Sequence, residues 1–212
     1  MRQSAVTFKA KGLNFEGVIA TPDDTKEKLP GVVICHPHPL HGGNMDNNVV
    51  LAVTFGLVEK GCAVFRFNFR GVGNSEGQHT RGEKEYQEAL GALEFMKAWD
   101  QVDRNKLGIC GYSFGTRVIL NSPALQKHPK VFAFVSPSFE ALESSTLKRN
   151  KRPKFVITGN RDRLVESEGL DTMWETFDPK PEFQVIDGAD HFWMGVEPKM
   201  ADPVSEFFAD NL

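Results

Sequence analysis

The hydrophobic and polar positions of this chain follow two different periods, and the change between them predicts the order of strands and helices. Residues 4–20 alternate apolar and polar side chains around Gly12, which predicts an antiparallel hairpin at a sheet edge. From residue 31 onward, short uninterrupted apolar runs replace this alternation. Such runs are typical of parallel strands that are covered on both faces. The predicted core strands are residues 31–35, 62–68, the run around Ile109, 131–135, 155–158 and 183–186.

Apolar residues at helical spacing separate the predicted strands. The first predicted helix has Val50, Val53, Leu57 and Val58 on one face and ends before Gly61. Further stripes of this kind lie within residues 86–96, 170–177 and 204–208. In the second of these helices, the charged positions are expected to face water: Glu83, Lys84, Glu88, Glu94 and Lys97.

This alternation of strands and helices predicts an α/β fold. We expect a mostly parallel central sheet with helices on both faces and the antiparallel hairpin at one edge, all within one domain spanning residues 1–212. The predicted strands 131–135 and 155–158 are separated by about 20 residues, too few for a lid of packed helices. The active site of such a fold is therefore expected to be open.

Composition narrows the range of partners. The 212 residues carry a net charge of −3, which argues against nucleic-acid binding. The N-terminus lacks the apolar stretch of a signal peptide, and the most apolar window, residues 49–58, is too short to span a bilayer. Three cysteines in apolar runs, Cys35, Cys62 and Cys110, fit a reducing compartment. A cytoplasmic protein without a membrane partner is the expectation, and a homo-oligomer is left open.

The stretch with the strongest chemical signal is Gly111-Tyr-Ser-Phe-Gly115, a G-x-S-x-G pattern between an apolar run and a predicted helix. Glycines at these two offsets suit a strand-to-helix turn that is too tight for Cβ atoms and that exposes the hydroxyl of Ser113. The N–H of Phe114 would lie at the helix start, where it can bind a developing oxyanion. Alternatively, Ser113 is only a helix N-cap.

A nucleophilic serine needs a base and a group that orients the base, and two later loops offer both. Asp162 follows the predicted strand 155–158, and His191 follows the strand 183–186. The order serine, aspartate, histidine is the one found in α/β-hydrolases. Asp190 is the competing acid, and Asp162 would then be a turn residue.

Together these features resemble the α/β-hydrolase superfamily, in particular its small lidless dienelactone-hydrolase-like and short-chain esterase members. The resemblance covers residues 4–212 and rests on four segments: Gly111–Gly115, the Asp162 loop, the His191 loop and residues 68–77. It implies the fold and ester-type chemistry. We expect a serine hydrolase that needs no cofactor and cleaves small carboxylic esters, with thioesters and lactones as further substrates, while a non-catalytic binding protein on the same fold is the alternative.

The loop His36-Pro-His-Pro-Leu-His-Gly-Gly43 occupies the place of the family's oxyanion loop. Its two prolines carry no N–H, so the second oxyanion donor is expected to be His38, with Leu40 as the other candidate. The spacing of His36, His38 and His41 also permits a different hypothesis, a metal-dependent hydrolase. Leu40 stands where the related metal-binding signature needs aspartate, so no metal site is expected.

Two further groups of residues could bind a substrate or partner, but each can also be explained by its role in the fold or by exposure to solvent. The basic run 148–154 could attract an anionic substrate or partner, although such runs are commonly solvated loops. Aromatic and sulfur-containing side chains could line an acyl pocket, but core packing explains them equally well. These are Phe114, Phe139, Trp193 and Met194.

Overall fold

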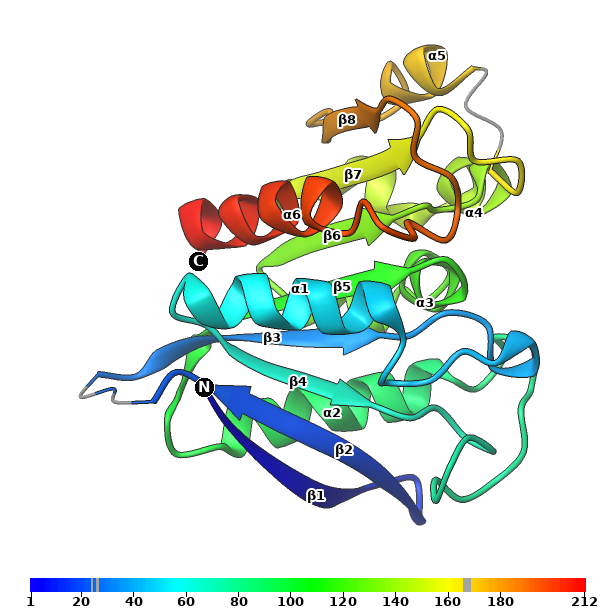
Figure 1. The fold of residues 1–212 in the computed structure, drawn as a ribbon. Coiled ribbons are helices and arrows are strands. Elements are labelled where there is room, and N and C mark those ends of the chain that lie inside the picture. Colours follow the sequence, from blue (N-terminus) through cyan, green and yellow to red (C-terminus); the bar gives the residue numbers. More distant parts are fainter. Residues whose placement is uncertain (24, 26, 166–168) are drawn as a thin grey trace.

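A computed structural model of the protein describes residues 1–23, 25, 27–165 and 169–212, with the side chain of residue 171 left out. In this part of the chain, eight strands form one sheet in the order β1-β2-β4-β3-β5-β6-β7-β8 (Figure 1). All pairs from β4 to β8 are parallel, whereas β1 and β2 run antiparallel at one edge, as predicted. The strands are β1 Arg2–Ala10, β2 Leu13–Thr21, β3 Leu29–Cys35, β4 Ala63–Phe67, β5 Val102–Tyr112, β6 Val131–Val135, β7 Lys154–Gly159 and β8 Glu182–Ile186.

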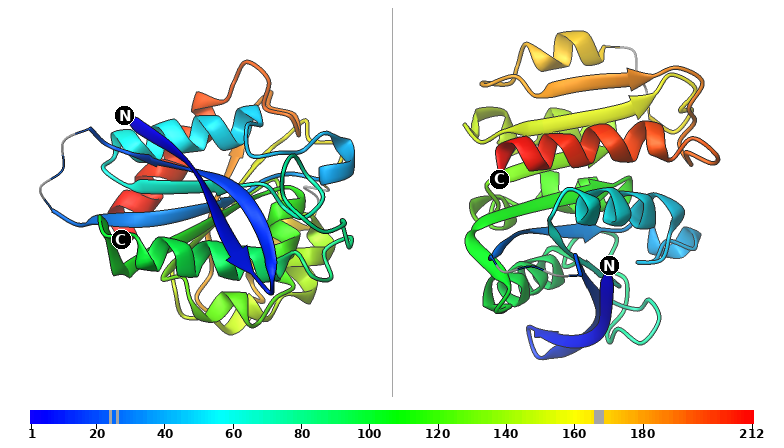
Figure 2. Two further views of the ribbon diagram at one scale, coloured as in Figure 1. Left: turned by 90° about the horizontal axis from the view of Figure 1, so that it is seen from below. Right: turned by 60° about the vertical axis from the view of Figure 1, so that its left-hand side comes forward.

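Helices cover both faces of the sheet, so the hydrophobic core has two layers. On one face, α1 (Asn48–Glu59) and α6 (Pro198–Asn211) lie side by side (Figure 1), and their apolar residues share one cluster with alternate side chains of the strands. The opposite face carries α2 (Tyr86–Ala98), α3 (Phe114–Leu120), α4 (Phe139–Ser144) and the short α5 (Leu170–Trp174) (Figure 2). The parallel strands thus have apolar residues on both sides, which explains their uninterrupted apolar runs.

The helical stripes of the sequence are buried as expected, with one exception in α2. Ala89, Leu93 and Met96 pack into the core, but Glu88, which we expected to face water, is completely buried. Its carboxylate receives hydrogen bonds from the side chain of Arg70, at 2.9 and 2.6 Å. The prediction for Glu88 was wrong because its partner lies 18 residues away on a loop, which helical periodicity does not report.

The C-terminal ends of the parallel strands lie at a common edge of the sheet, and the loops that leave this edge carry the predicted chemistry. Figure 1 shows the arrowheads of β3 to β7 pointing to this edge, with both termini near the opposite one. Between β6 and β7 the chain forms only α4 and a 3₁₀ turn, Thr146–Arg149, so no helical domain is inserted there. Within the described residues, no helix combines the length and apolarity required to cross a membrane.

The basic run 148–154 is partly structural. Arg152 donates hydrogen bonds to the carbonyls of Gln126, Pro129 and Lys127 at 2.7 to 2.9 Å, and Lys154 donates to the carbonyls of Asn150 and Arg152. These two side chains thus stabilise the turns before β6 and β7 by donating hydrogen bonds to backbone carbonyls. Their donors are therefore already paired within the fold.

Candidate active site

Ser113 lies on the turn from β5 to α3 in a conformation that few residues adopt. Its φ is 51° and its ψ is −113°, and its side chain makes no helix-capping hydrogen bond. Strained backbone of this kind costs of order 1–3 kcal/mol and is concentrated at functional sites. The hydroxyl therefore does not act as the N-cap that the alternative interpretation required.

The two glycines of the motif are needed because the chain approaches itself at this turn. A Cβ on Gly111 would lie 2.7 Å from the backbone of Gly115, and a Cβ on Gly115 would lie 2.2 Å from the carbonyl oxygen of Cys35. Both contacts are with backbone, which has little room to yield. The second contact also places the start of α3 directly against the end of β3, from which the histidine-rich loop departs.

The structure brings Ser113, His191 and Asp162 into one hydrogen-bonded row. The Nε2 atom of His191 lies 2.9 Å from the Ser113 hydroxyl, and its Nδ1 lies 2.8 Å from Oδ2 of Asp162. The carboxyl group of Asp162 is fully buried, and the imidazole is nearly so. This is the geometry in which a carboxylate orients an imidazole and the imidazole can take a proton from a hydroxyl.

The competing acid, Asp190, is used in a turn. Its Oδ1 accepts hydrogen bonds from the N–H groups of Phe192 and Trp193 at 2.9 and 3.0 Å. Asp162 also accepts two backbone hydrogen bonds, from Leu164 and Val165, but through Oδ1, so that Oδ2 is left for His191. Asp162 is thus a turn residue through Oδ1, as the alternative interpretation held, while its Oδ2 contacts the imidazole of His191.

Two residues that sequence reasoning did not single out hold the histidine loop in place. The Tyr112 hydroxyl donates a 2.7 Å hydrogen bond to the carbonyl of His191, so the residue before the serine anchors the loop that carries the base. Asn48, at the start of α1, donates to the carbonyl of Phe192 at 3.0 Å. A tyrosine inside a buried apolar strand was the available signal, since a buried hydroxyl needs a partner.

The loop after β3 lies beside the start of α3, where the rings of His38 and Phe114 have centroids 5.0 Å apart. The N–H of Leu40, one of the two candidate oxyanion donors, donates to Nδ1 of His38 at 3.2 Å. Within the described residues, the backbone N–H groups of His38 and Phe114 have no hydrogen-bond acceptor. These two donors therefore remain available for an oxygen atom.

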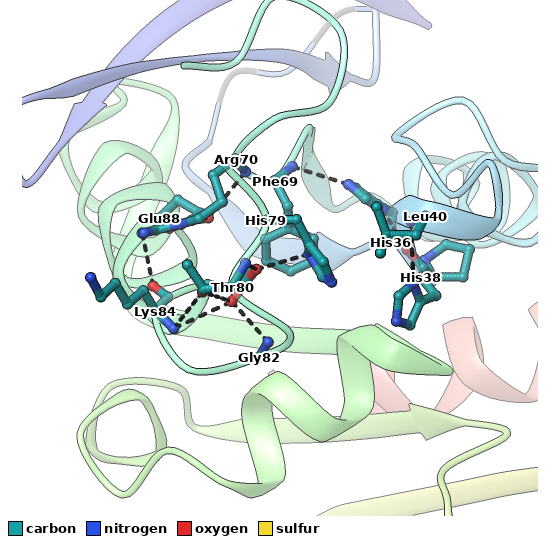
Figure 3. Close-up of polar contacts among 12 residues, drawn as sticks. His36, His38, Leu40, Phe69, Arg70, His79, Thr80, Gly82, Lys84 and Glu88 are labelled. Carbon is teal, nitrogen blue, oxygen red and sulfur yellow. Dashed lines mark hydrogen bonds and ion pairs between the residues drawn. The ribbon is translucent and has the colours of Figure 1, made fainter. Parts of the chain in front are cut away.

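The segment after β4, residues 69–85, forms a second wall of this region (Figure 3). Arg70 ties it to α2 through Glu88, and also donates a 2.9 Å hydrogen bond to the carbonyl of Lys84 near the end of the same segment. The carboxylate of Glu85 accepts hydrogen bonds from Thr80 and Gly82, which close a tight turn. These hydrogen bonds were not predicted from the sequence, because the residues that they join do not belong to a common sequence motif.

A protein-family model described as the alpha/beta hydrolase domain matches residues 32–201. The chain belongs to this family. The match contains all four segments on which the resemblance rests, and the first hairpin lies outside it. The sheet order described above is that of a hydrolase without an inserted lid.

Solved hydrolase structures superpose on nearly the whole chain. A Xanthomonas campestris protein described as an α/β serine hydrolase without lid has a TM-score of 0.86 and 25% identity, covering 98% of this chain and 94% of its own. An α/β serine hydrolase homologue from Coxiella burnetii has a TM-score of 0.84 and 30% identity, with 97% of each chain covered. An uncharacterized protein of Rickettsia prowazekii is 28% identical over 86% of this chain and 80% of its own length.

His36, at the start of the histidine-rich loop of this hydrolase, is a buried structural residue. Its Nδ1 lies 2.7 Å from the carbonyl oxygen of Pro37, and its Nε2 accepts a 3.0 Å hydrogen bond from the N–H of Phe69. Both ring nitrogens thus contact backbone atoms, so His36 has no free nitrogen for the metal ion of the alternative hypothesis. Within the described part of the chain, no group of three or more His, Cys, Asp or Glu side chains has an arrangement that could hold a metal ion.

The fold is expected to lose stability in mild acid through His36. Burial lowers the pKa of His36 to about 4, from an ordinary value of 6.5, despite the opposing effect of its hydrogen bond to Pro37. Because the folded pKa lies below the unfolded one, the contribution is complete above pH 6.5 and is lost progressively as the pH falls towards 4, by about 3 kcal/mol in all. The free energy of unfolding, measured by urea titration, should fall less steeply over this range in His36→Asn than in the wild type. Equal slopes would contradict the assignment.

The four side chains considered for an acyl pocket lie in different surroundings. Trp193 is completely buried in the core, and its indole N–H donates to the hydroxyl of Ser136. Met194 is largely exposed, Phe139 is half-buried, and Phe114 is buried beside His38 and His79. Of the four, Phe114 is adjacent to Ser113 in sequence, and its ring borders the region of the two unoccupied N–H groups.

Proposed function

We propose that this protein is a serine hydrolase that cleaves small carboxylic esters, and by the same chemistry thioesters and lactones, through a Ser113-His191-Asp162 triad. The observation that carries the proposal is the pair of hydrogen bonds, 2.9 and 2.8 Å long, that joins the three side chains at a strained turn. The likeness to a protein described as a lidless α/β serine hydrolase supports it.

In the first half of the proposed reaction, His191 accepts the proton of Ser113 as its oxygen attacks the ester carbonyl. The buried carboxylate of Asp162 holds the proton on Nδ1, which leaves Nε2 as the acceptor, and it stabilises the imidazolium that forms. The imidazolium then protonates the leaving alcohol, and an acyl group remains on Ser113. In the second half, His191 takes a proton from water, whose oxygen attacks the acyl carbonyl. The imidazolium then gives this proton to the Ser113 oxygen as the carboxylic acid leaves, which restores both side chains.

The negative charge that develops on the carbonyl oxygen needs donors that are already in place. We assign this role to the N–H groups of Phe114 and His38. Both lack an acceptor within the described residues, and their rings are in contact. Leu40, the other candidate, has its N–H committed to the side chain of His38. The prolines at 37 and 39 restrict the loop, which suits a preorganised donor.

A fluorophosphonate ester tests this proposal, because the reagent forms a stable phosphonyl bond only with an activated serine. Treatment of the folded wild-type protein should add one phosphonyl group, which peptide mass spectrometry should locate on Ser113. Protein unfolded in urea is the control and should stay unmodified, since the hydrogen-bonded row no longer exists. A folded wild-type protein that resists the reagent, or that is modified at another serine, would refute the proposed function.

A further inference from the structure

The turn that follows the proposed base carries two exposed apolar side chains, Phe192 and Met194, to which the mechanism above assigns no role. Their exposed fractions are 57% and 72%, whereas Trp193 between them is completely buried. The ring of Phe192 stands nearly perpendicular to the imidazole of His191, with the two centroids 5.7 Å apart. Figure 1 shows this segment, between β8 and α6, at the edge to which the parallel strands point. A large apolar surface is therefore exposed directly beside the group that transfers the proton.

The backbone of this turn is held in the conformation that leaves the two side chains at the surface. Trp193 has a φ of 60°, which is rare for a bulky residue and persists only where the surroundings enforce it. Asp190 accepts the N–H groups of Phe192 and Trp193, and the indole N–H of Trp193 donates to the buried Ser136 at 3.2 Å. With Trp193 anchored in the core, its two neighbours remain exposed.

Asn48, at the start of α1, fixes the outer side of the same turn. Its side-chain amide donates to the carbonyl of Phe192 at 3.0 Å and to Oε1 of Glu197 at 2.9 Å. The amide nitrogen also lies 3.7 Å from the sulfur of Met194. The apolar surface is thus preorganised, because a ligand that binds there does not have to order the backbone first, and this lowers the entropic cost of binding.

Exposed apolar side chains are concentrated at this edge of the sheet. Leu40, on the loop after β3, and Leu164, on the loop after β7, are also largely exposed, so three loops of this edge each carry at least one such residue. Single exposed apolar residues are normal, whereas a group of them marks a binding surface. In the rest of the described chain, the large apolar residues that are exposed lie outside these loops: Met1, Phe55 and Val185.

The chemistry of the proposed reaction decides which part of an ester would meet Phe192. When the ester C–O bond breaks, the proton on Nε2 of His191 goes to the alcohol oxygen, so this oxygen must lie within hydrogen-bond reach of Nε2. The alcohol chain therefore leaves the reacting centre on the side of the imidazole, where Phe192 stands. The acyl chain is attached to the carbonyl carbon and has no such requirement.

We infer that Phe192 and Met194 form a binding surface for an apolar alcohol part of the substrate, so that the enzyme prefers esters of longer alkyl alcohols to esters of ethanol. The inference rests on the proposed ester hydrolysis at Ser113 and specifies its leaving group. Because both side chains are exposed, one side of the bound alkyl chain stays in water, and the gain for each methylene group is smaller than for full burial.

Hexyl acetate and ethyl hexanoate test the inference, because these isomers extend ethyl acetate by the same length on opposite sides of the ester bond. The wild-type enzyme should have a kcat/KM at least about tenfold higher for hexyl acetate than for ethyl acetate, although both form the same acyl-enzyme. The double variant Phe192→Ser/Met194→Ser should reduce this ratio below about threefold, and should lower kcat/KM for hexyl acetate at least about fivefold more than for ethyl hexanoate. Phe55→Ser, at an exposed phenylalanine further along α1, is the matched control and should keep the wild-type ratio.

Binding of 1-hexanol to the Ser113→Ala protein separates this inference from the proposed reaction, because it requires no turnover. In an NMR titration of the ¹⁵N-labelled protein, 1-hexanol should shift the amide signals of residues 190–196 more than other signals, and ethanol should shift them less. Adding the changes at Phe192 and Met194 should remove the difference between the two alcohols.

Three results would overturn the inference, whatever the outcome of the fluorophosphonate experiment. The first is an equal loss of activity on the two isomeric esters in the double variant, and the second is a hexanol response that persists in that variant. The third is a doubled mass of the wild-type protein in light scattering that the double variant returns to the mass of one chain, because the surface would then be covered by a second copy.

Discussion

Replacing Ser113 by alanine is expected to lower kcat/KM for small esters by between about 10⁴- and 10⁶-fold. The change removes the only atom that would bond to the substrate carbonyl, so water must attack without an acyl-enzyme. The two N–H groups of Phe114 and His38 would still bind the oxyanion, which is why a small residual rate above the uncatalysed one is expected. Rates on a chromogenic acetate ester, with protein purified free of other esterases, provide the measurement.

The same variant should fold normally. Ser113 makes no capping hydrogen bond, and its backbone contacts with Val135 and Thr116 do not involve the side chain. Alanine at a φ of 51° has the same backbone restriction as serine. The thermal midpoint should therefore change by only a few degrees. If the folded variant retained the wild-type rate, the serine mechanism would be wrong.

Asp162→Asn is expected to lower kcat by about 10⁴-fold with little effect on the fold. An asparagine can keep the two hydrogen bonds that Oδ1 accepts from Leu164 and Val165. Its amide then faces Nδ1 of His191, which becomes an acceptor, and the ring proton moves to Nε2. A protonated Nε2 donates to the Ser113 hydroxyl and can no longer take its proton.

Asp190→Asn is the matched control for this experiment. It changes an aspartate only one residue from His191, but the hydrogen bonds of Asp190 go to the N–H groups of Phe192 and Trp193, which an asparagine oxygen can also accept. Its kcat should stay within about tenfold of the wild-type value. If Asp190→Asn lost more activity than Asp162→Asn, the acid of the triad would be misassigned.

The sequence was sufficient to order the candidates for the triad because of a general property of parallel sheets. Strands that run in the same direction end at the same edge, so the loops after β5, β7 and β8 had to come close to one another. Ser113, Asp162 and His191 each follow one of these strands. Whether Asp162 or Asp190 would face the histidine depended on loop conformation, and there neither spacing nor residue type decides.

The choice between His38 and Leu40 shows the same limit at closer range. Both residues lie in one loop, and both carry an N–H that the adjacent prolines lack. Only the three-dimensional structure revealed that the side chain of His38 accepts the N–H of Leu40, and this hydrogen bond is the reason why we assign the proposed role to His38. A side chain that bonds to the backbone two residues away is a local contact, but it forms only in one conformation of the loop.

By itself, the sequence determined the succession of strands and helices, the two-sided burial of the sheet and the turn that carries Ser113. These features depend on periodicity and on glycine at fixed offsets, which act between residues close in the chain. Tertiary structure alone decided that Glu88 is buried against Arg70, that both nitrogens of His36 are committed to backbone, and that His79 lies between Glu85 and Phe114. The physical reason is that a buried charge or polar nitrogen needs a partner, and the partners Arg70 of Glu88 and Phe69 of His36 lie on other segments, which reach these side chains only once the chain has packed.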